Sequence, residues 1–230
     1  MEPHRIPSIP ASMYYIPNFI SPDEESHILN KIPSNRWITL THRRLQSLPA
    51  RLTATNTLLS STPLPEFLTT PITPRFNGLE IFAGAPHGVN HCLINEYLPG
   101  QGIMPHEDGA AYHPVVATVS LGGTVVLDVT EKGGGSGGEK LGKWRILQEP
   151  RSLLVTMGSA YTDTLHGIAE VHEDDDLNAE TVANWELLGD REPFIANGGL
   201  NTRTTRISLT YRDVKKVSTI GSKILGRGKS

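Results

Sequence analysis

Two segments of the chain alternate between polar and apolar positions, which is the pattern of a half-buried β-strand. In residues 89–97, Asn95 and Tyr97 fall on the same face of the expected strand. In residues 204–212, alternation creates one polar face, which consists of Arg206, Ser208, Thr210 and Arg212. Two arginines inside a sheet are costly unless an anion compensates them, so this strand indicates an anion site. An exposed edge strand with two solvated arginines fits the pattern equally well.

Further apolar runs predict that most of the chain is β-structure. Residues 115–121 and 124–129 flank a Gly-Gly pair and therefore predict a hairpin. Residues 144–147 and 152–157 predict a second pair of strands joined by a short turn, and residues 166–171 follow as another strand. The pattern favours a mainly β (α+β) fold.

One helix is predicted near the N-terminus. Ser21 suits an N-cap, Pro22 the first helical position, and Glu24 completes a capping box. Pro33 is expected to end this helix. Residues 37–74 are rich in Thr, Ser and Pro and show little periodicity, so we expect a loop-rich cover there.

The composition indicates a soluble globular protein. The chain has 230 residues, of which 37% are hydrophobic and 20% are charged. No apolar run reaches the roughly 18 residues that cross a bilayer, and residues 1–10 lack the apolar centre of a secretory signal. Cys92 is the only cysteine, which excludes an intrachain disulfide and favours a reducing compartment. We expect a monomer in the cytoplasm, the nucleus or both, without a membrane partner.

Charge is distributed unevenly along the chain. Residues 170–192 hold nine acidic residues against one arginine, although the whole chain has a net charge of only -3. We expect flexible insertions near residues 131–142, which are glycine-rich, and 172–202, which are acidic. Residues 203–230 carry eight Lys and Arg against one Asp, and residues 215–230 read as a solvated basic tail, with a polyanion site as the alternative.

A histidine and an aspartate two residues apart predict a metal site. His106 and Asp108 lie between Pro105 and Gly109, so both side chains can turn toward one point. Two histidines and one carboxylate form the ligand set of non-haem Fe(II) oxygenases. The candidate for the third ligand is His166, which precedes a glycine and a short apolar run. A surface turn or a hydrogen-bonded pair gives the same spacing, so the spacing alone leaves these readings open.

Four motifs occur in a fixed order: N-x-Y from Asn95, H-x-D from His106, H-G-I from His166, and R-x-x-x-x-x-R from Arg206. Together they resemble the motifs of the AlkB-like Fe(II)/2-oxoglutarate-dependent dioxygenases. Residues 95–109 add a longer match to the eukaryotic branch known as the sixth AlkB homologue. The likeness covers most of the chain and fails in the glycine-rich and acidic segments.

This resemblance implies a double-stranded β-helix, or jelly roll, with N-terminal helices and a lid over its open end. Residues 1–230 would form a single domain. About residues 1–80 would supply the helix and the substrate lid, about 81–214 the jelly-roll core, and 215–230 the tail.

The resemblance also implies the cofactors and the residues that hold them. The cofactors would be Fe(II), 2-oxoglutarate as cosubstrate, and O₂. The iron ligands would be His106, Asp108 and His166. The residues that bind 2-oxoglutarate would be Asn95, Tyr97, Arg206 and Arg212, to which the inward face of its strand adds Ser208. Arg206 would hold the distal carboxylate.

Enzymes of this family convert 2-oxoglutarate to succinate and CO₂ while they hydroxylate a substrate C–H bond, and a hydroxylated N-methyl group falls apart to formaldehyde and free amine. The resemblance therefore implies oxidative demethylation of N-methylated bases in RNA or single-stranded DNA. The alternatives are a protein hydroxylase or demethylase, and a nucleic-acid-binding protein with little catalysis.

Four residues are candidates for contacts with a nucleic-acid substrate. Tyr112 and His113 follow the metal motif and could stack on a base, although plain packing near the mouth explains them as well. Arg43 and Arg44 could meet phosphates, although adjacent loop arginines are commonly just solvated. The residues directly after Asp108 are Gly109, Ala110 and Ala111, without the further acid that a base-reading site would use, which departs from the founding repair enzymes of the family.

Overall fold

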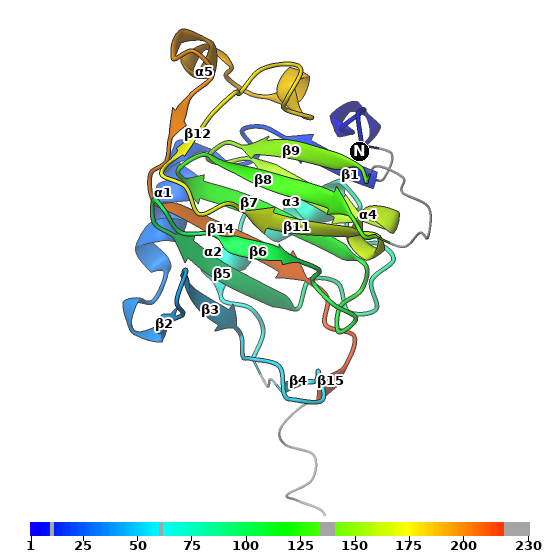
Figure 1. Cartoon of the computed structure of the whole chain (residues 1–230). Coiled ribbons are helices and arrows are strands. Elements are labelled where there is room, and N and C mark those ends of the chain that lie inside the picture. Colours follow the sequence, from blue (N-terminus) through cyan, green and yellow to red (C-terminus); the bar gives the residue numbers. More distant parts are fainter. Residues whose placement is uncertain (10–11, 60–61, 134–140, 219–230) are drawn as a thin grey trace, which may run out of the picture.

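The computed structural model describes residues 1–9, 12–59, 62–133 and 141–218. Most of its strands form two antiparallel sheets that face each other (Figure 1), and two further pairs of short strands lie outside them. The larger sheet has the order β1-β10-β7-β14-β5-β3-β2. Its strands are β1 (Ser12–Ile16), β10 (Leu153–Met157), β7 (Val115–Gly122), β14 (Arg206–Arg212), β5 (His91–Tyr97), β3 (Arg44–Leu48) and β2 (Ile38–Thr39).

The smaller sheet has four strands in the order β6-β11-β8-β9. These are β6 (Ile103–His106), β11 (Thr164–Ile168), β8 (Val125–Glu131) and β9 (Lys143–Gln148). Apolar side chains of both sheets fill the space between them. The fold is the predicted mainly β jelly roll.

The predicted hairpin around the Gly-Gly pair is wrong. The strands β7 and β8 exist but belong to different sheets, so the chain crosses the sandwich between them. Gly122 has a φ of +77°, and a Cβ there would lie 2.6 Å from the carbonyl oxygen of Thr205. The backbone N–H of Gly122 donates to Oε1 of Glu25 at 2.8 Å. The two glycines therefore serve a crossing between sheets, where only glycine avoids the clash.

The predicted pairing of residues 144–147 with 152–157 fails for the same reason. β9 and β10 are consecutive in sequence, but they too lie in opposite sheets. Strand positions could be read from apolar runs, because each strand buries at least one face. The pairing of the strands could not be read from these runs, because a jelly roll joins consecutive strands across the sandwich as readily as along one sheet.

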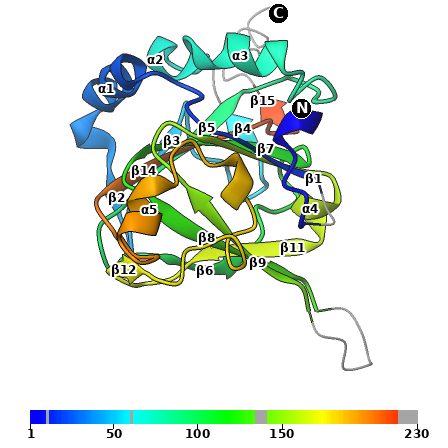
Figure 2. The same cartoon turned by 90° about the horizontal axis from the view of Figure 1, so that it is seen from above.

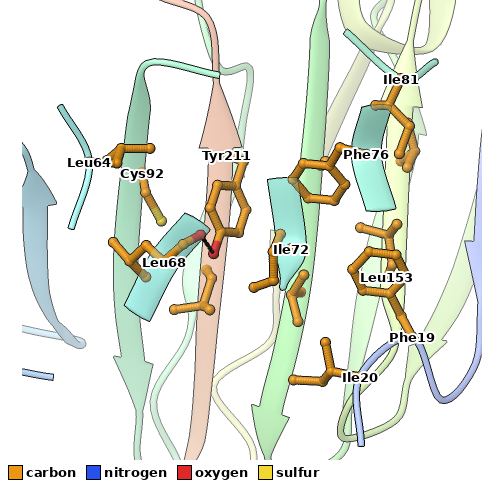
Figure 3. Packing of buried hydrophobic residues seen from close by; sticks show 14 of the residues in the cluster. Phe19, Ile20, Leu64, Leu68, Ile72, Phe76, Ile81, Cys92, Leu153 and Tyr211 are labelled. Atoms are coloured by element: carbon orange, nitrogen blue, oxygen red, sulfur yellow. Dashed lines mark hydrogen bonds between the residues drawn. The ribbon is translucent and has the colours of Figure 1, made fainter. Parts of the chain in front are cut away.

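Three helices cover the outer face of the larger sheet (Figure 2). The first is α1 (Pro22–Lys31), which begins with the predicted capping box of Ser21 and Glu24. The others are α2 (Glu66–Thr69) and α3 (Ile72–Gly78). Figure 3 shows how Phe76 of α3 packs edge-on against Tyr211 of β14, with ring centroids 5.2 Å apart.

These helices hold β14 in place through contacts with its outer, apolar face. The Tyr211 hydroxyl donates to the carbonyl of Leu68 at 2.9 Å, and Cys92 is buried in the same cluster, as expected for a strand residue. Because the apolar face of β14 is held by the helices, its polar face must point into the sandwich. The alternative of an exposed edge strand is therefore excluded.

The remaining elements are short. They are η1 (Glu2–His4), η2 (Ser34–Arg36), β4 (Leu58–Leu59), α4 (Ser159–Thr162), β12 (Glu173–Asp174), η3 (Trp185–Leu187), α5 (Glu192–Ala196), β13 (Asn201–Thr202) and β15 (Val217–Ser218). In the part of the chain that the structure describes, no helix is long and apolar enough to cross a membrane.

The loop-rich cover over residues 37–74 is more regular than predicted. It contributes β2 and β3 to the larger sheet and also contains α2. Most of the glycine-rich insertion, residues 134–140, lies outside the described residues, as does the tail from 219. The beginning of the tail forms β15, which pairs in parallel with β4.

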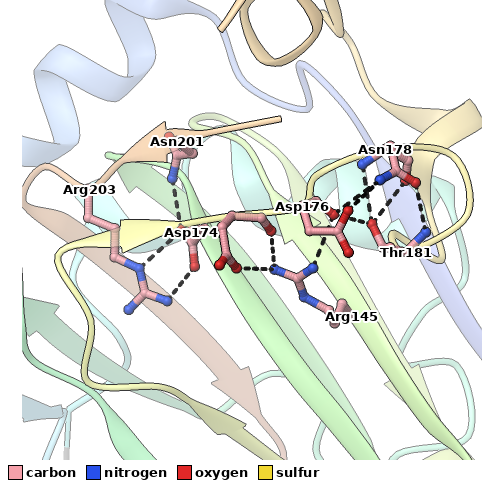
Figure 4. A network of polar contacts seen from close by, with 8 residues as sticks. Arg145, Asp174, Asp176, Asn178, Thr181, Asn201 and Arg203 are labelled. Carbon is pink, nitrogen blue, oxygen red and sulfur yellow. Dashed lines mark hydrogen bonds and ion pairs between the residues drawn. The ribbon is translucent and has the colours of Figure 1, made fainter. Parts of the chain in front are cut away.

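The acidic segment of residues 172–202 is packed against the sandwich, which differs from the prediction of a flexible insertion. Trp185 and Phe194 join an apolar cluster that contains residues of both sheets. Asp174 accepts hydrogen bonds from Arg203 Nε at 3.0 Å and from the Asn201 side chain at 2.9 Å (Figure 4). Composition indicated disorder here because it counts the acids, whereas the apolar residues among them decide the packing.

Loss of the Asp174 carboxylate is expected to destabilise this segment strongly. The side chains of Asp174 and Arg203 are only 3% and 4% exposed, so Asp174→Ala leaves a buried guanidinium without a counter-ion. We expect a loss of about 3 kcal/mol in the free energy of unfolding, measured by urea denaturation. Asp175→Ala is the matched control, because the Asp175 side chain is 84% exposed. Equal effects of both substitutions would contradict a stabilising buried pair.

Candidate active site

A cavity of about 100 Å³ lies between the two sheets. The larger sheet lines it with β5 and β14, and the smaller sheet lines it with β6 and β11, among others. This space holds several water molecules or one small organic molecule. The polar faces predicted for residues 89–97 and 204–212 both line this cavity, through residues such as Asn95 and Ser208.

Two imidazoles meet at the cavity from neighbouring strands. His106 on β6 and His166 on β11 are direct register partners, and their ring centroids are 4.5 Å apart. Nδ1 of His106 lies 2.9 Å from the carbonyl oxygen of Met104, which fixes that nitrogen as the donor. The Nε2 lone pair of His106 is thereby left for a ligand.

The carboxylate of Asp108 lies beside these rings. Its Oδ2 is 3.9 Å from Nε2 of His166, and its Oδ1 accepts a hydrogen bond from Arg212. Burial lowers the pKa of His166 to about 4, against the opposing effect of Asp108, so the ring is neutral at neutral pH and can donate a lone pair to a metal.

The three side chains are neighbours, but they are not arranged as a finished metal cage. Among the residues that the structure describes, no three His, Cys, Asp or Glu side chains form a group that could hold an ion as they stand. Asp108 is turned toward Arg212 rather than toward a point shared with both histidines. The assignment of His106, Asp108 and His166 as ligands therefore stays a prediction, which their neighbourhood and donor chemistry support.

Arg206 is buried at another part of the cavity. Its Nη2 donates to the Ser120 hydroxyl at 2.9 Å and to Oε1 of Gln148 at 3.0 Å. Its Nε has no hydrogen-bond partner in the structure. Burial lowers the pKa of Arg206 to about 10, so the guanidinium is still charged at neutral pH. A buried cation with a free donor and only neutral partners is suited to bind an anionic group.

Arg212 lies at the opposite end of the same strand. Burial alone would lower its pKa, but the Asp108 carboxylate and Tyr112 outweigh burial, so the pKa is raised. Its guanidinium stacks over the Tyr112 ring at 4.7 Å. Arg206 and Arg212 thus occupy separate ends of the cavity, as the sequence predicted, and Arg212 holds the carboxylate of Asp108.

The other predicted cosubstrate residues lie between these ends. Ser208 is the register partner of Asn95, and Arg206 is the register partner of Tyr97. The carbon Cζ of Arg206 is 5.9 Å from the centroid of the Tyr97 ring. Asn95, Tyr97 and Ser208 all line the cavity.

The four candidate substrate residues have different surroundings. Only Arg43 lines the cavity. Arg44 points the other way, donates to Glu96 at 2.7 Å, and stacks on Trp37 at 4.5 Å.

Tyr112 and His113 are also kept from the cavity. One face of Tyr112 is covered by Arg212, and neither Tyr112 nor His113 is among the residues that line the cavity. Base stacking by these two residues and phosphate binding by Arg44 therefore have no support in this geometry.

Sequence reasoning missed the residues that position the site. Ser120 and Gln148 hold Arg206, and Tyr161 donates its hydroxyl hydrogen to the carbonyl of Gly109 at 2.7 Å, next to the metal motif. Gln148 could have been suspected, because it is a polar residue at the end of an apolar strand. Ser120 and Tyr161 give no comparable signal, since their partners are distant in sequence.

Residues 12–212 match the 2OG-Fe(II) oxygenase superfamily. The chain belongs to this superfamily. Its similarity to AlkB homologues places it among the AlkB-like members. It is 35% identical to the probable RNA/DNA demethylase ALKBH6 of Danio rerio, over 94% of this chain and 92% of that protein. It is also 26% identical to the tRNA (carboxymethyluridine(34)-5-O)-methyltransferase alkbh8 of Xenopus tropicalis, where the match covers 91% of this chain but only 32% of that protein.

Solved structures agree on the fold of this AlkB-like oxygenase. The structure of OsALKBH1 superposes with a TM-score of 0.54 at 15% identity, over 89% of this chain and 99% of that chain. A 2OG-Fe(II) oxygenase from Burkholderia pseudomallei superposes with a TM-score of 0.51 at 13% identity, over 90% of this chain and 88% of that chain. At such low identity these matches establish the jelly-roll fold alone.

Family membership makes this protein a 2-oxoglutarate-dependent dioxygenase that uses Fe(II), 2-oxoglutarate and O₂. The cavity fits these groups. Two imidazoles and a carboxylate suit Fe(II), and the free Nε of Arg206 suits a carboxylate.

Proposed function

We propose that this dioxygenase removes methyl groups from N-methylated bases in RNA or single-stranded DNA. Two relatives are named for action on RNA or DNA and on tRNA, respectively. The observation that carries the proposal is structural. His106, Asp108 and His166 meet at the same cavity as the buried Arg206, so a metal and a dicarboxylate can be held side by side.

In this proposal each part of the cavity has one task. His106, Asp108 and His166 would hold iron, which together with 2-oxoglutarate activates O₂ to oxidise a substrate C–H bond. Arg206 would bind the distal carboxylate of 2-oxoglutarate. Asn95, Tyr97 and Ser208 would line the space between. Arg212 orients Asp108 through their shared hydrogen bond.

The atoms of the proposed reaction balance. One oxygen atom of O₂ enters the methyl group as a hydroxyl, and the other enters succinate as 2-oxoglutarate loses CO₂. The hydroxymethyl group then leaves as formaldehyde and the base nitrogen regains its proton. A base inside a duplex cannot reach a cavity between two sheets, so the substrate base must be unpaired or flipped out.

The test is a comparison of substrate classes. Succinate release is measured with methylated RNA, methylated single-stranded DNA and methylated peptides at equal concentration. We expect stimulation by methylated nucleic acid, together with formaldehyde in equal amount. We also expect binding that weakens steeply with salt, because cationic side chains release counter-ions from the phosphate backbone. Stimulation by peptides alone would favour the protein hydroxylase, the alternative that the relatives do not favour.

We further infer the domain organisation, the oligomeric state and the cellular location of the enzyme. Residues 1–230 act as one domain, in which the segment up to about residue 80 serves as the lid over the cavity mouth. The enzyme works as a monomer in the cytoplasm, the nucleus or both, without a membrane partner. The position of Arg43 at the cavity supports the lid, because this segment reaches the site.

A further inference from the structure

The cavity carries an excess of positive charge. Three of the described residues that line it are arginines, namely Arg43, Arg206 and Arg212. The lining includes a single acid, Asp108. Arginine stays protonated at all physiological pH values. Apart from the three candidate metal ligands, the walls of the cavity therefore disfavour an organic cation.

The one carboxylate is already engaged. Asp108 accepts from Arg212 on one oxygen and faces His166 with the other. The nearest acid in sequence, Glu107, has a half-exposed side chain that is paired with Lys132. Glu96 is also turned away, since it pairs with Arg44. No acid among the described residues is left in the cavity to compensate a cationic ligand.

Arg43 is the cation best placed to meet a substrate. It belongs to the segment just before β3, and its Nε donates to Oδ1 of Asn95 at 3.3 Å. Its terminal nitrogens make no hydrogen bond to any described residue, so they are available. A guanidinium presents its N–H groups as a planar fork that matches carbonyl oxygens and unprotonated ring nitrogens, and it offers no acceptor.

Methylated bases differ in charge. N1-methyladenine and N3-methylcytosine are cations at neutral pH, and methylation blocks the ring nitrogen that would accept on the modified edge. Their exocyclic amines are donors, and N3-methylcytosine alone keeps an acceptor there, its O2 carbonyl. N6-methyladenine and N3-methyluracil are neutral, and they keep a ring nitrogen or carbonyl oxygens that accept hydrogen bonds. Asp108 pairs with Arg212, and 2-oxoglutarate would bind Arg206, so the charge of Arg43 is the one that a cationic base would meet uncompensated. Like charges repel most strongly in such a partly desolvated cavity.

We propose that the substrates of this enzyme are electrically neutral N-methylated bases, and that Arg43 is the residue that selects them by donating to an acceptor on the base. This inference rests on the proposed function and names its substrate class.

The experiment uses four single-stranded RNAs of one sequence, each with one modified base: N6-methyladenine, N3-methyluracil, N1-methyladenine or N3-methylcytosine. Formaldehyde release gives kcat/KM, and fluorescence anisotropy without oxygen gives Kd. We expect the neutral pair to exceed the cationic pair by about tenfold or more in kcat/KM. Turnover of the cationic pair at an equal or higher rate would overturn the inference.

Charge reversal at Arg43 tests the role of this residue. Arg43→Glu should reduce the neutral-to-cationic ratio by about tenfold or more, and Arg43→Gln, which keeps donors but loses the charge, should reduce it less. Arg36→Glu is the matched control, because Arg36 lies exposed in η2 with the same charge and does not line the cavity. We expect the control to leave the ratio unchanged.

Two results would remove Arg43 from this role. An unchanged ratio in Arg43→Glu would show that another group selects the base. A large loss of 2-oxoglutarate affinity in Arg43→Gln would show that Arg43 serves the cosubstrate. Failure of all four bases to be demethylated, both in these RNAs and in single-stranded DNAs of the same sequence, would overturn the proposed function and with it this inference. Turnover of the cationic bases alone would overturn only the inference.

Discussion

Replacement of Asp108 by alanine is expected to abolish iron binding. Asp108 supplies the only carboxylate among the described residues that line the cavity. Its loss removes an anionic ligand and also leaves the positive charge of Arg212 facing the metal. The loss of affinity should exceed the roughly 10- to 100-fold that removal of an outer-shell partner causes. Metal content after desalting and calorimetric titration with Fe(II) under anaerobic conditions measure this directly.

Two further variants complete the test of metal binding. Asp108→Ala breaks a buried ion pair, so a loss of iron in this variant can also come from unfolding. His106 is the more exposed ligand, and we expect His106→Ala to lose iron in the same way while the protein stays folded. Asp128→Ala is the matched control on the neighbouring strand β8, since Asp128 does not line the cavity. Normal iron content in folded His106→Ala would refute the ligand assignment.

The second large effect is expected at Arg206. Arg206→Met keeps most of the side-chain volume but removes the charge, so it should weaken 2-oxoglutarate binding by about 2 kcal/mol or more, which is roughly a 30-fold rise in Kd. Iron binding should not change, because Arg206 lies away from His106 and Asp108. Anaerobic calorimetry with 2-oxoglutarate on the iron-loaded enzyme measures the first quantity, and metal analysis measures the second.

A substitution of Gln148, which holds Arg206, should have the same kind of effect but a smaller one. Its Oε1 accepts from Nη2 of Arg206 at 3.0 Å, so Gln148→Leu should leave the guanidinium present but less well positioned. We expect a smaller loss of 2-oxoglutarate affinity than in Arg206→Met. Unchanged affinity in Arg206→Met would mean that another residue binds the distal carboxylate.

Much of the site could be predicted because strand periodicity places side chains without knowledge of the fold. Alternation along residues 204–212 put Arg206 and Arg212 on one face, and the structure confirms that both line the cavity. The spacing of His106 and Asp108 similarly predicted their shared direction. His166 was a weaker candidate, suggested by the glycine and the apolar run that follow it and then by the family motif. Its spacing says nothing of His106, because the two are brought together by register across two strands.

The wrong predictions have one cause: residues that are neighbours in sequence were assumed to be neighbours in space. The Gly-Gly pair suggested a hairpin, although the chain crosses between sheets there. Arg43 and Arg44 were both candidates for contacts with phosphates, but adjacent residues of an extended chain point to opposite sides. One therefore reaches the cavity, and the other pairs with Glu96 on the far face.

The position of β14 in the larger sheet has a consequence for how the enzyme folds. It is the last long strand of the described chain, yet it lies between β7 and β5 in the middle of the larger sheet. Until it inserts, β5 and β7 have no shared partner, and the cavity lacks both Arg206 and Arg212. A chain emerging from the ribosome therefore cannot assemble this site early. Pairings between strands so distant in sequence make folding slow, and until the C-terminal strand arrives the two unpaired strand edges are exposed to aggregation.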